Sequence, residues 1–266
     1  MHTDVTLLER LARLGYGSKA VIYAAVGVLA VLAVVNRGGV ITDTSGALRV
    51  LLRQPFGQLL LFVLAVGLCG YAVWRVLDAL ADPDRDGTAP RGLVTRGGNL
   101  IRGVVYGALG FEAFRLLRGL RGSSSDDAEL WTARIFALPF GEVAVAIAGG
   151  AAAAYGISEV VHGVRGTHDD KLDWSPIPSD VRPVVQRICR FGVAVRGGLI
   201  TTLGVFLIRA SFNHDPDQAA GSRESMLHLS GVFDGRWFLA LIAAGVIAYA
   251  VDQAVHAVCR RIRPVI

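Results

Sequence analysis

Six long apolar runs constrain the fold of this chain more than any other feature. The runs are Ala20–Val35, Phe56–Leu77, Gly103–Leu117, Val143–Val161, Gly197–Ile208 and Trp237–Val258. A helix that crosses a membrane needs about 20 largely apolar residues, and it satisfies its own backbone hydrogen bonds in lipid. The third and fifth runs reach this length only with Arg102 or Arg196 at one end, where an arginine can extend to the headgroups. We therefore predict an all-α integral membrane protein with six transmembrane helices.

The balance of residue types supports this prediction. Charged residues make up 18% of the chain and apolar residues 53%, whereas about a quarter of an ordinary soluble domain is charged. This balance excludes a disordered chain, a disulfide scaffold and a typical cytosolic enzyme. The formal net charge is +5, but the arginines lie at the ends of the apolar runs and not among aromatic residues. We therefore expect no nucleic-acid partner.

Six spans place both termini on one side of the membrane. The ends and loops predicted for that side hold more Lys and Arg than the loops of the other side, which predicts that both termini are cytoplasmic. Arg, Ala, Gly and Val are also much commoner than Lys and Ile, as in GC-rich bacterial genomes. The expected location is a bacterial plasma membrane.

One sequence pattern occurs three times along the chain. In the first helix of each copy it reads Arg-x-Gly-x-x-x-Lys/Arg-x-x-x-Tyr-x-x-x-Gly, beginning at Arg13, Arg96 and Arg190, with Ile200 replacing the third tyrosine. The second helices begin at Pro55-Phe56-Gly57, Pro139-Phe140-Gly141 and Phe233-Asp234-Gly235, and they carry Tyr71, Tyr155 and Tyr249 at one equivalent position. This regularity predicts three tandem two-helix repeats, which span residues 13–81, 96–165 and 190–259.

Each predicted repeat crosses the membrane twice, so successive repeats have the same orientation. Parallel repeats are related by an axis along the membrane normal, whereas inverted repeats are related by an axis in its plane. We therefore predict a single membrane domain, 1–266, in which the three repeats surround a pseudo-threefold axis.

These motifs resemble those of a bacterial membrane-protein family known as domain of unknown function 1206. The resemblance rests on the Arg-x-Gly pattern, the Pro-Phe-Gly helix starts and the tyrosine-bearing helix ends, and it covers roughly residues 13–256. It implies a six-helix integral membrane protein and carries over no catalytic residues. Ile200 and the proline missing before Phe233 depart from the pattern.

The Pro-Phe-Gly steps predict helix starts on the outer side of the membrane, with the proline in the first helical turn. The stretches before them, Thr44–Gln54, Asp127–Leu138 and Ser222–Val232, have apolar residues at helical spacing. We expect each to form a short amphipathic helix at the outer interface. Trp131 and Trp237 are expected in the aromatic belt there.

A ring of polar residues is predicted near the cytoplasmic interface. Lys19, Arg102 and Arg196 share one repeat position, and Tyr23 and Tyr106 follow one turn later. The second helices carry Tyr71, Arg75 and Asp78, then Tyr155, Glu159 and His162, then Tyr249, Gln253 and His256 at spacings that put each set on one face. The hypothesis is that Lys19, Arg102, Arg196, Tyr23, Tyr106 and Glu159 bind an anionic lipid headgroup or solute. Alternatively, Glu159 pairs with a neighbouring arginine and the other cations extend to phosphates.

Two carboxylates lie inside apolar runs. Glu112 is well within the third run and is costly there unless it is paired or protonated. We expect it to face the bundle interior, with Arg115 as a candidate partner, and Asp252 is a second candidate of this kind. Both are possible intramembrane proton or ion sites.

Asp78, His162 and His256 share a repeat position, and two histidines with a carboxylate suit a divalent metal if their faces converge. Haem ligation by the two histidines is a weaker variant of this interpretation. Histidines at helix ends more often form interfacial hydrogen bonds, so we expect no cofactor.

The sequence contains no GxSxG, HExxH or glycine-rich phosphate loop, so an enzyme is not expected. The favoured function is a non-enzymatic membrane protein that binds lipid or a partner, which is another membrane protein or a second copy of the chain. The alternative is a small-solute or ion transporter or channel that uses the pseudo-threefold axis. A transporter is expected to have a broken helix at the midplane, and Gly149-Gly150 is the candidate position.

Overall fold

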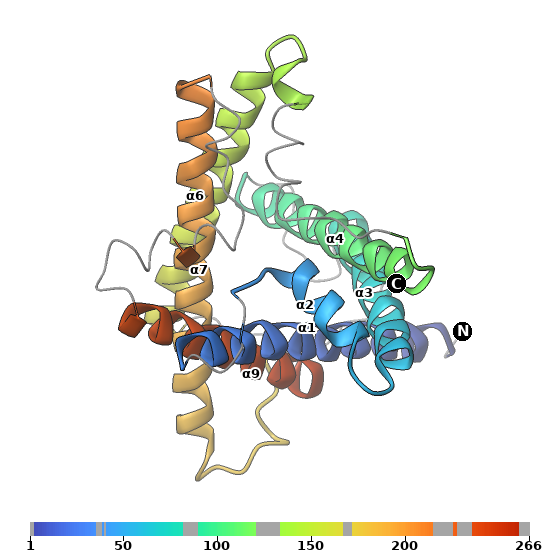
Figure 1. Cartoon of the computed structure of the whole chain (residues 1–266). Helices are drawn as coiled ribbons and strands as arrows, with labels where there is room; N and C mark the ends of the chain where they lie inside the picture. Colours follow the sequence, from blue (N-terminus) through green and yellow to red (C-terminus); the bar gives the residue numbers. More distant parts are fainter. Residues whose placement is uncertain are drawn as a thin grey trace.

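The computed structural model describes residues 3–35, 39, 41–81, 90–120, 134–166, 172–214, 226–227 and 236–260. The helices are α1 (Thr3–Val34), α2 (Thr44–Leu52), α3 (Gly57–Ala81), α4 (Pro90–Leu117), α6 (Gly141–Arg165), α7 (Arg182–Phe212) and α9 (Arg236–Cys259) (Figure 1). Each predicted apolar run falls on a different long helix. The described residues form no extended strand, only an isolated bridge between Leu172 and Arg260. The prediction of an all-α fold is confirmed.

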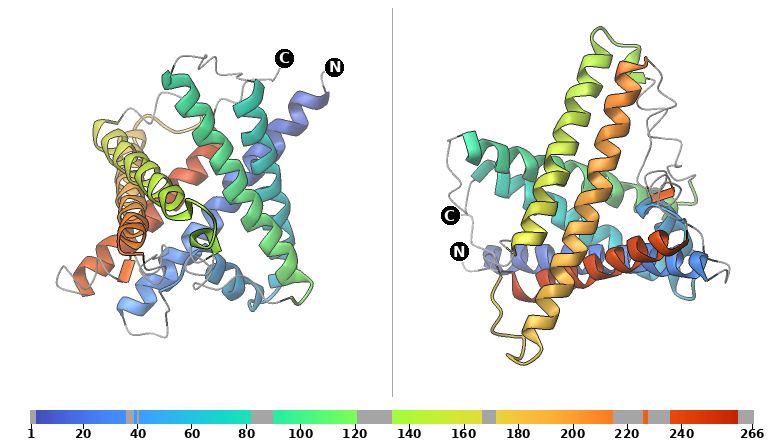
Figure 2. Two further views of the ribbon diagram at one scale, coloured as in Figure 1. Left: turned by 90° about the horizontal axis from the view of Figure 1, so that it is seen from above. Right: turned by 90° about the vertical axis from the view of Figure 1, so that its left-hand side faces the viewer.

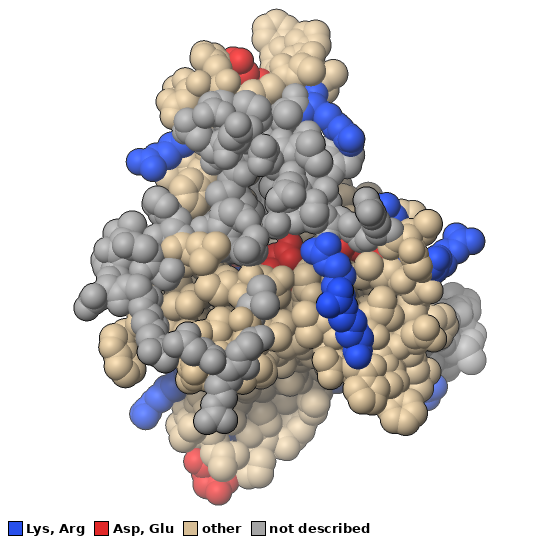
Figure 3. Space-filling view, in the orientation of Figure 1, with Lys and Arg blue, Asp and Glu red and all other residues tan. Residues whose placement is uncertain are grey.

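Five helical segments in the described residues are long and apolar enough to cross a membrane: Glu9–Val34, Gly57–Ala81, Gly141–Arg165, Arg182–Phe212 and Trp237–Cys259. In α4 the uncharged stretch between Arg102 and Glu112 is short, so α4 does not meet this criterion. The face in Figure 3 is largely uncharged where it is described, with basic side chains standing apart from one another. The chain therefore has the helices of a multi-pass membrane protein.

The long helices pack as three pairs that run in three different directions (Figures 1 and 2). The pairs are α3 with α4, α6 with α7, and α9 with α1. Each pair joins the second helix of one repeat to the first helix of the next repeat, and α9 with α1 closes the series. Within repeats, α1 packs on α3 and α7 on α9, but α4 and α6 are not in extended contact in the described residues. We call this open interface the α4–α6 seam.

An arginine at the start of each repeat contacts the end of the preceding second helix. The Arg13 guanidinium donates to the carbonyl oxygens of Ala257 and Val258 at 2.9 and 2.6 Å. Arg96 donates in the same way to Ala79 and Leu80 at 2.7 and 3.2 Å. These carbonyls lie in the last helical turn, where they have no intrahelical donor. The contact of Arg13 also puts the start of α1 and the end of α9 at the same end of the molecule.

Glycines allow the paired helices to approach closely. On α6, Gly149, Gly156 and Gly163 recur every seventh residue and face α7. A Cβ on Gly149 would lie 2.8 Å from the Gly204 carbonyl oxygen, and one on Gly156 would lie 2.6 Å from that of Gly197. Close backbone approach at small residues is a main source of helix association in lipid, because lipid tails are as apolar as the helices. The glycine row therefore defines the α6–α7 pair.

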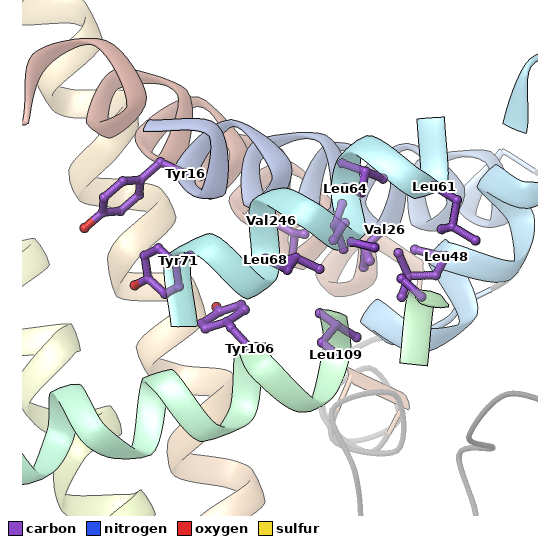
Figure 4. Packing of buried hydrophobic residues seen from close by; sticks show 14 of the residues in the cluster. Tyr16, Val26, Leu48, Leu61, Leu64, Leu68, Tyr71, Tyr106, Leu109 and Val246 are labelled. Carbon is purple, nitrogen blue, oxygen red and sulfur yellow. The ribbon is translucent and has the colours of Figure 1, made fainter. Parts of the chain in front are cut away.

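The main core lies among α1, α2, α3, α4 and α9. Figure 4 shows Leu48 and Leu61 at one end of it and Tyr16, Tyr71 and Tyr106 at the other. The packing thus changes from aliphatic to aromatic along the helices. No residue of α6 belongs to this cluster in the described part of the chain. Helix α6 is therefore held by α7 and not by the core.

The turns before α3 and α6 correct one prediction. The helices begin at Gly57 and Gly141, and Phe56 and Phe140 are left-handed, with φ of 58° and 63°. The amides of the two glycines donate to the carbonyls of Gln54 and Leu138, so Pro55 and Pro139 lie in a tight turn before the helix and not in its first turn.

The first predicted amphipathic helix is confirmed as α2, which Asp43 caps through the Gly46 amide at 2.7 Å. Only parts of Asp127–Leu138 and Ser222–Val232 are described, and Trp131, Phe233, Asp234 and Gly235 lie outside the described residues. Trp237 is described and highly exposed, as an aromatic belt requires.

We predict that the substitution Gly156→Leu separates α6 from α7, because its side chain meets the Gly197 backbone. The expected loss of stability is on the order of 1–3 kcal/mol, typical of overpacking, seen as a lower Tm of the detergent-solubilised protein. Gly150→Leu is the matched control, since nothing described lies within 4 Å of a Cβ at Gly150. Equal Tm values for the two variants would contradict this packing.

Candidate functional site

One cavity of about 290 Å³ lies among the six long helices. Its described lining is strongly polar and aromatic: Tyr16, Lys19, Tyr71, Arg75, Thr95, Asn99, Arg102, Tyr106, Tyr155, Glu159, His162, Arg196, Tyr249, Gln253, His256 and Arg260. The three cations that share a repeat position therefore converge on one space, as do the three equivalent tyrosines of the second helices. The geometric part of the polar-ring prediction is thus seen in the structure.

Lys19 is buried on the aromatic side of the cavity, with 4% of its surface exposed. Its Nζ is 4.6 Å from the ring centroids of both Tyr71 and Tyr106 and 3.4 Å from the Tyr71 hydroxyl. No carboxylate of the described residues forms a salt bridge with it. Tyr23 supports this wall from behind, with its hydroxyl 3.0 Å from that of Tyr106 and its ring edge-on to Tyr249.

Arg102 and Arg196 meet at α6. Arg102 donates to the Tyr155 hydroxyl at 2.6 Å, and Arg196 approaches the same hydroxyl at 3.4 Å. Glu159 lies between them, 3.7 Å from Arg102 and 3.4 Å from Arg196. Glu159 therefore contacts two cations, whereas the alternative weighed from the sequence paired it with one neighbouring arginine.

Arg75 organises the opposite wall on α3. Its guanidinium donates to Asp78 and Asn99 at 3.1 and 3.0 Å and to the hydroxyls of Tyr71 and Tyr16 at 2.9 and 3.0 Å. Asn99 also donates to Asp78 at 2.9 Å. Asp78 is thus part of a hydrogen-bonded network next to the cavity, which leaves it unsuited to ligate a metal.

Sequence reasoning missed four residues of the lining: Tyr16, Thr95, Asn99 and Arg260. A signal for two of them is present, because Tyr16 and Asn99 both lie three residues before a cation of the ring, at the same repeat position. The third repeat has Val193 there, so the pattern is incomplete. Arg260 follows the end of α9, and its guanidinium lies over the rings of Tyr16 and Trp74.

Asp252 lies beneath the α9 wall of the cavity and is fully buried. Gln253 donates to its carboxylate at 2.8 Å, and His256 Nδ1 lies 3.5 Å from it. Two buried atoms of the lining have no hydrogen-bond partner in the described residues: Gln253 Oε1 and Arg260 Nε. Gln253 and Arg260 both line the cavity.

The metal arrangement suggested for Asp78, His162 and His256 is not formed. The described residues contain no group of three His, Cys, Asp or Glu side chains that could hold a metal ion. His162 and His256 both line the cavity, but Asp78 bonds to Arg75 and Asn99, and His256 is next to Asp252.

Glu112 lies away from the cavity, towards the outer end of α4. It is buried, and Ser45 of α2 donates to its Oε2 at 2.7 Å. The expectation that Glu112 faces the interior is therefore met, with a hydroxyl of the amphipathic helix as a partner. Whether Glu112 or Asp252 carries protons or ions stays a prediction.

Comparisons with known proteins match most of the chain. The family model described as Domain of Unknown Function (DUF1206) matches residues 14–82, 97–166 and 191–260. The "Uncharacterized protein YxxB" of Bacillus subtilis (strain 168) is 31% identical over 242 residues, which is 91% of this chain and 87% of that protein. No solved structure matches the chain.

We predict that Glu159→Gln destabilises the protein, because two partly buried arginines lose their shared carboxylate. The expected loss is on the order of 2 kcal/mol, as for other broken pairs of limited exposure, measured as a lower Tm in detergent. Adding inorganic phosphate should restore part of the Tm. Glu142→Gln, which removes an exposed carboxylate from the same helix, is the matched control and should leave the Tm unchanged.

Proposed function

The chain belongs to the family described as Domain of Unknown Function (DUF1206), and we propose that it is a multi-pass membrane protein that binds an anionic ligand in its polar cavity. Its role is to bind this ligand and not to catalyse a reaction. The described lining holds five cationic side chains, Lys19, Arg75, Arg102, Arg196 and Arg260, against two carboxylates that pair with them, Asp78 beside Arg75 and Glu159 between Arg102 and Arg196. An anionic ligand would balance this excess.

Lys19 is the observation that carries the proposal. A buried cation without a counterion is costly, since tyrosine rings compensate only part of its lost hydration. The Lys19 ammonium has rings and one hydroxyl as its described neighbours. A phosphate or carboxylate in the cavity would supply the missing negative charge next to it.

The ligand chemistry follows from the donors. Arg102 and Arg196 present planar guanidinium groups, which suit the two oxygens of a phosphate or carboxylate. Gln253 Oε1 and Arg260 Nε are unpartnered in the described residues and suit a hydroxyl on the same ligand. A volume of about 290 Å³ fits such a group, since pockets for small molecules start near 300 Å³. A lipid headgroup and a small soluble anion both have this chemistry.

In our proposal α4 is the sixth span, and the three repeats surround a pseudo-threefold axis. The equivalent contacts of Arg13 and Arg96 support this arrangement, as does the series of helix pairs that α9 and α1 close. Both termini would lie in the cytoplasm of a bacterial cell, with the cavity at inner-leaflet depth. Each basic residue near an anionic leaflet gains roughly 1 kcal/mol.

A transport function has less support than binding. The sequence suggested a helix break at Gly149-Gly150, but α6 is continuous from Gly141 to Arg165. Gly149 instead packs on the backbone of α7. We therefore place the protein among membrane proteins that bind a lipid, another membrane protein or a second copy of the chain.

We predict that Arg102→Gln plus Arg196→Gln removes an anionic ligand that co-purifies with the wild type. Mass spectrometry of lipid and small-molecule extracts should recover this ligand from the wild-type protein at a level about tenfold or more above that of the variant, as expected when roughly 1.4 kcal/mol of binding is lost. A phospholipid in the extract identifies a headgroup as the ligand, and a polar metabolite identifies a soluble anion.

The matched control is Arg118→Gln plus Arg209→Gln, which removes two exposed arginines from the other ends of the helices. This control should retain the ligand. Equal recovery from all three proteins, with unchanged helix content by circular dichroism, would refute the proposal and leave Arg102 and Arg196 as structural partners of Glu159.

We also predict the topology. A cysteine placed at residue 3 should resist a membrane-impermeant maleimide in intact cells, whereas a cysteine at Phe56, which is highly exposed at the outer turn, should react. Reaction at residue 3 and protection at Phe56 would reverse the proposed orientation.

A further inference from the structure

We propose that the ligand is a membrane lipid that enters sideways through the α4–α6 seam, with its anionic headgroup in the cavity and its acyl chains in the seam. This inference rests on the anion-binding function proposed above and names the class of ligand. The inference follows from the α4–α6 seam, because the two helices of the second repeat do not pack on each other as those of the first and third repeats do.

The glycine two residues after the start of the repeat pattern shows how the three interfaces differ. A Cβ on Gly15 would collide with Tyr71 of α3, and one on Gly192 would collide with Tyr249 of α9. Gly98 of α4 is the equivalent residue of the second repeat, and nothing among the described residues lies within 4 Å of a Cβ there. The first and third repeats are thus closed where the second is open.

The side chains of α6 explain why this repeat stays open. In α3, Leu64 lies two turns before Tyr71 and Leu68 one turn before it, and both are buried in the core. Ile242 and Val246 have these positions in α9 and are also buried there.

In α6 the equivalent residues are Ala148 and Ala152. An alanine side chain is too short to replace a leucine in a packed interior. As a result α6 does not pack into the core, and Ala148 remains exposed.

The seam opens directly into the cavity. Arg102 and Tyr106 of α4 line the cavity on one side of the seam, and Tyr155 and Glu159 of α6 line it on the other. Ala148, Ala152, Tyr155 and Glu159 form one stripe of α6 at helical spacing, so the cavity wall continues into the seam. Arg102 makes contacts across the seam, to Tyr155 and Glu159.

Away from the cavity the flanks of the two helices are apolar. Leu109 of α4 lies two turns after Arg102 on the same face, and Ala148 and Ala152 of α6 lie on the same face as Tyr155. The outer faces of the two helices are apolar too, and Val104 and Ile157 there are more than half exposed. A site that is cationic at one end and apolar along its length matches a lipid with an anionic headgroup. The cavity volume of about 290 Å³ holds a headgroup but not two acyl chains, which therefore have to leave between the helices.

The test places leucines at the two alanine positions of the seam, because leucines at the equivalent positions of α3 pack into the core. Full-length Ala148→Leu plus Ala152→Leu protein, delipidated in detergent, is titrated with phosphatidylglycerol and with glycerol phosphate, and binding is read by native mass spectrometry. We expect roughly tenfold weaker binding of phosphatidylglycerol than in the wild type, with binding of glycerol phosphate retained. Ala154→Leu is the matched control, because Ala154 is exposed and turned away from the Tyr155 stripe, and it should bind both probes as the wild type does.

The outcomes separate this inference from the proposed function. If the double variant binds phosphatidylglycerol as strongly as the wild type does, the proposal that the lipid enters through the seam is wrong. The same holds if the wild type binds glycerol phosphate but not phosphatidylglycerol. If Arg102→Gln plus Arg196→Gln binds both probes as the wild type does, the anion-binding function itself fails. Should the double variant not fold, Ala148→Leu alone is used, and it should show the same selective loss at a Tm equal to that of the control.

Discussion

Close approach of helix backbones at glycine is the constraint on which this structure depends. Helices in lipid gain little from burying apolar side chains, so their contacts are set by how near the backbones can come. Gly15 and Gly192 bring two second helices against two first helices, and the glycine row of α6 fixes α7. These approaches place Lys19 and Arg196 at one space, because each of these cations lies one turn after Gly15 or Gly192.

Much of the fold follows from the sequence because apolar runs and repetition both translate directly into geometry. A run of apolar residues gives a helix, and residues that share a repeat position meet around a common axis, as Lys19, Arg102 and Arg196 do at the cavity. The pairing of α3 with α4 could not be predicted in this way. In a chain of similar repeats, the sequence pattern is the same whether the second helix of a repeat packs on the first helix of its own repeat or on that of the next repeat. The open seam depends on Ala148 and Ala152. Their effect could not be predicted from the sequence, because it depends on the burial of the equivalent residues Leu64 and Leu68 in the core.

The repeats form a nearly regular scaffold around an irregular site. One position of the second helices holds Arg75, Glu159 and Gln253, and each makes different contacts at the cavity wall. Arg75 joins a network with Asp78, while Glu159 separates two arginines. A ligand bound there would meet a cation, a carboxylate and an amide from three directions, so it would have one orientation where a symmetric site would offer three.

The contact of Arg13 with Ala257 and Val258 has a consequence for the connectivity of the gene. Arg96 makes the same contact with Ala79 and Leu80, although that junction is covalently continuous along the chain. The junction between the last helix and the first is therefore built like the internal ones and differs only in lacking a peptide link. Circular permutation, with the two ends joined and new termini opened in the polar stretch between α3 and α4, would preserve every helix contact, because α1 and the end of α9 already lie against each other at Arg13.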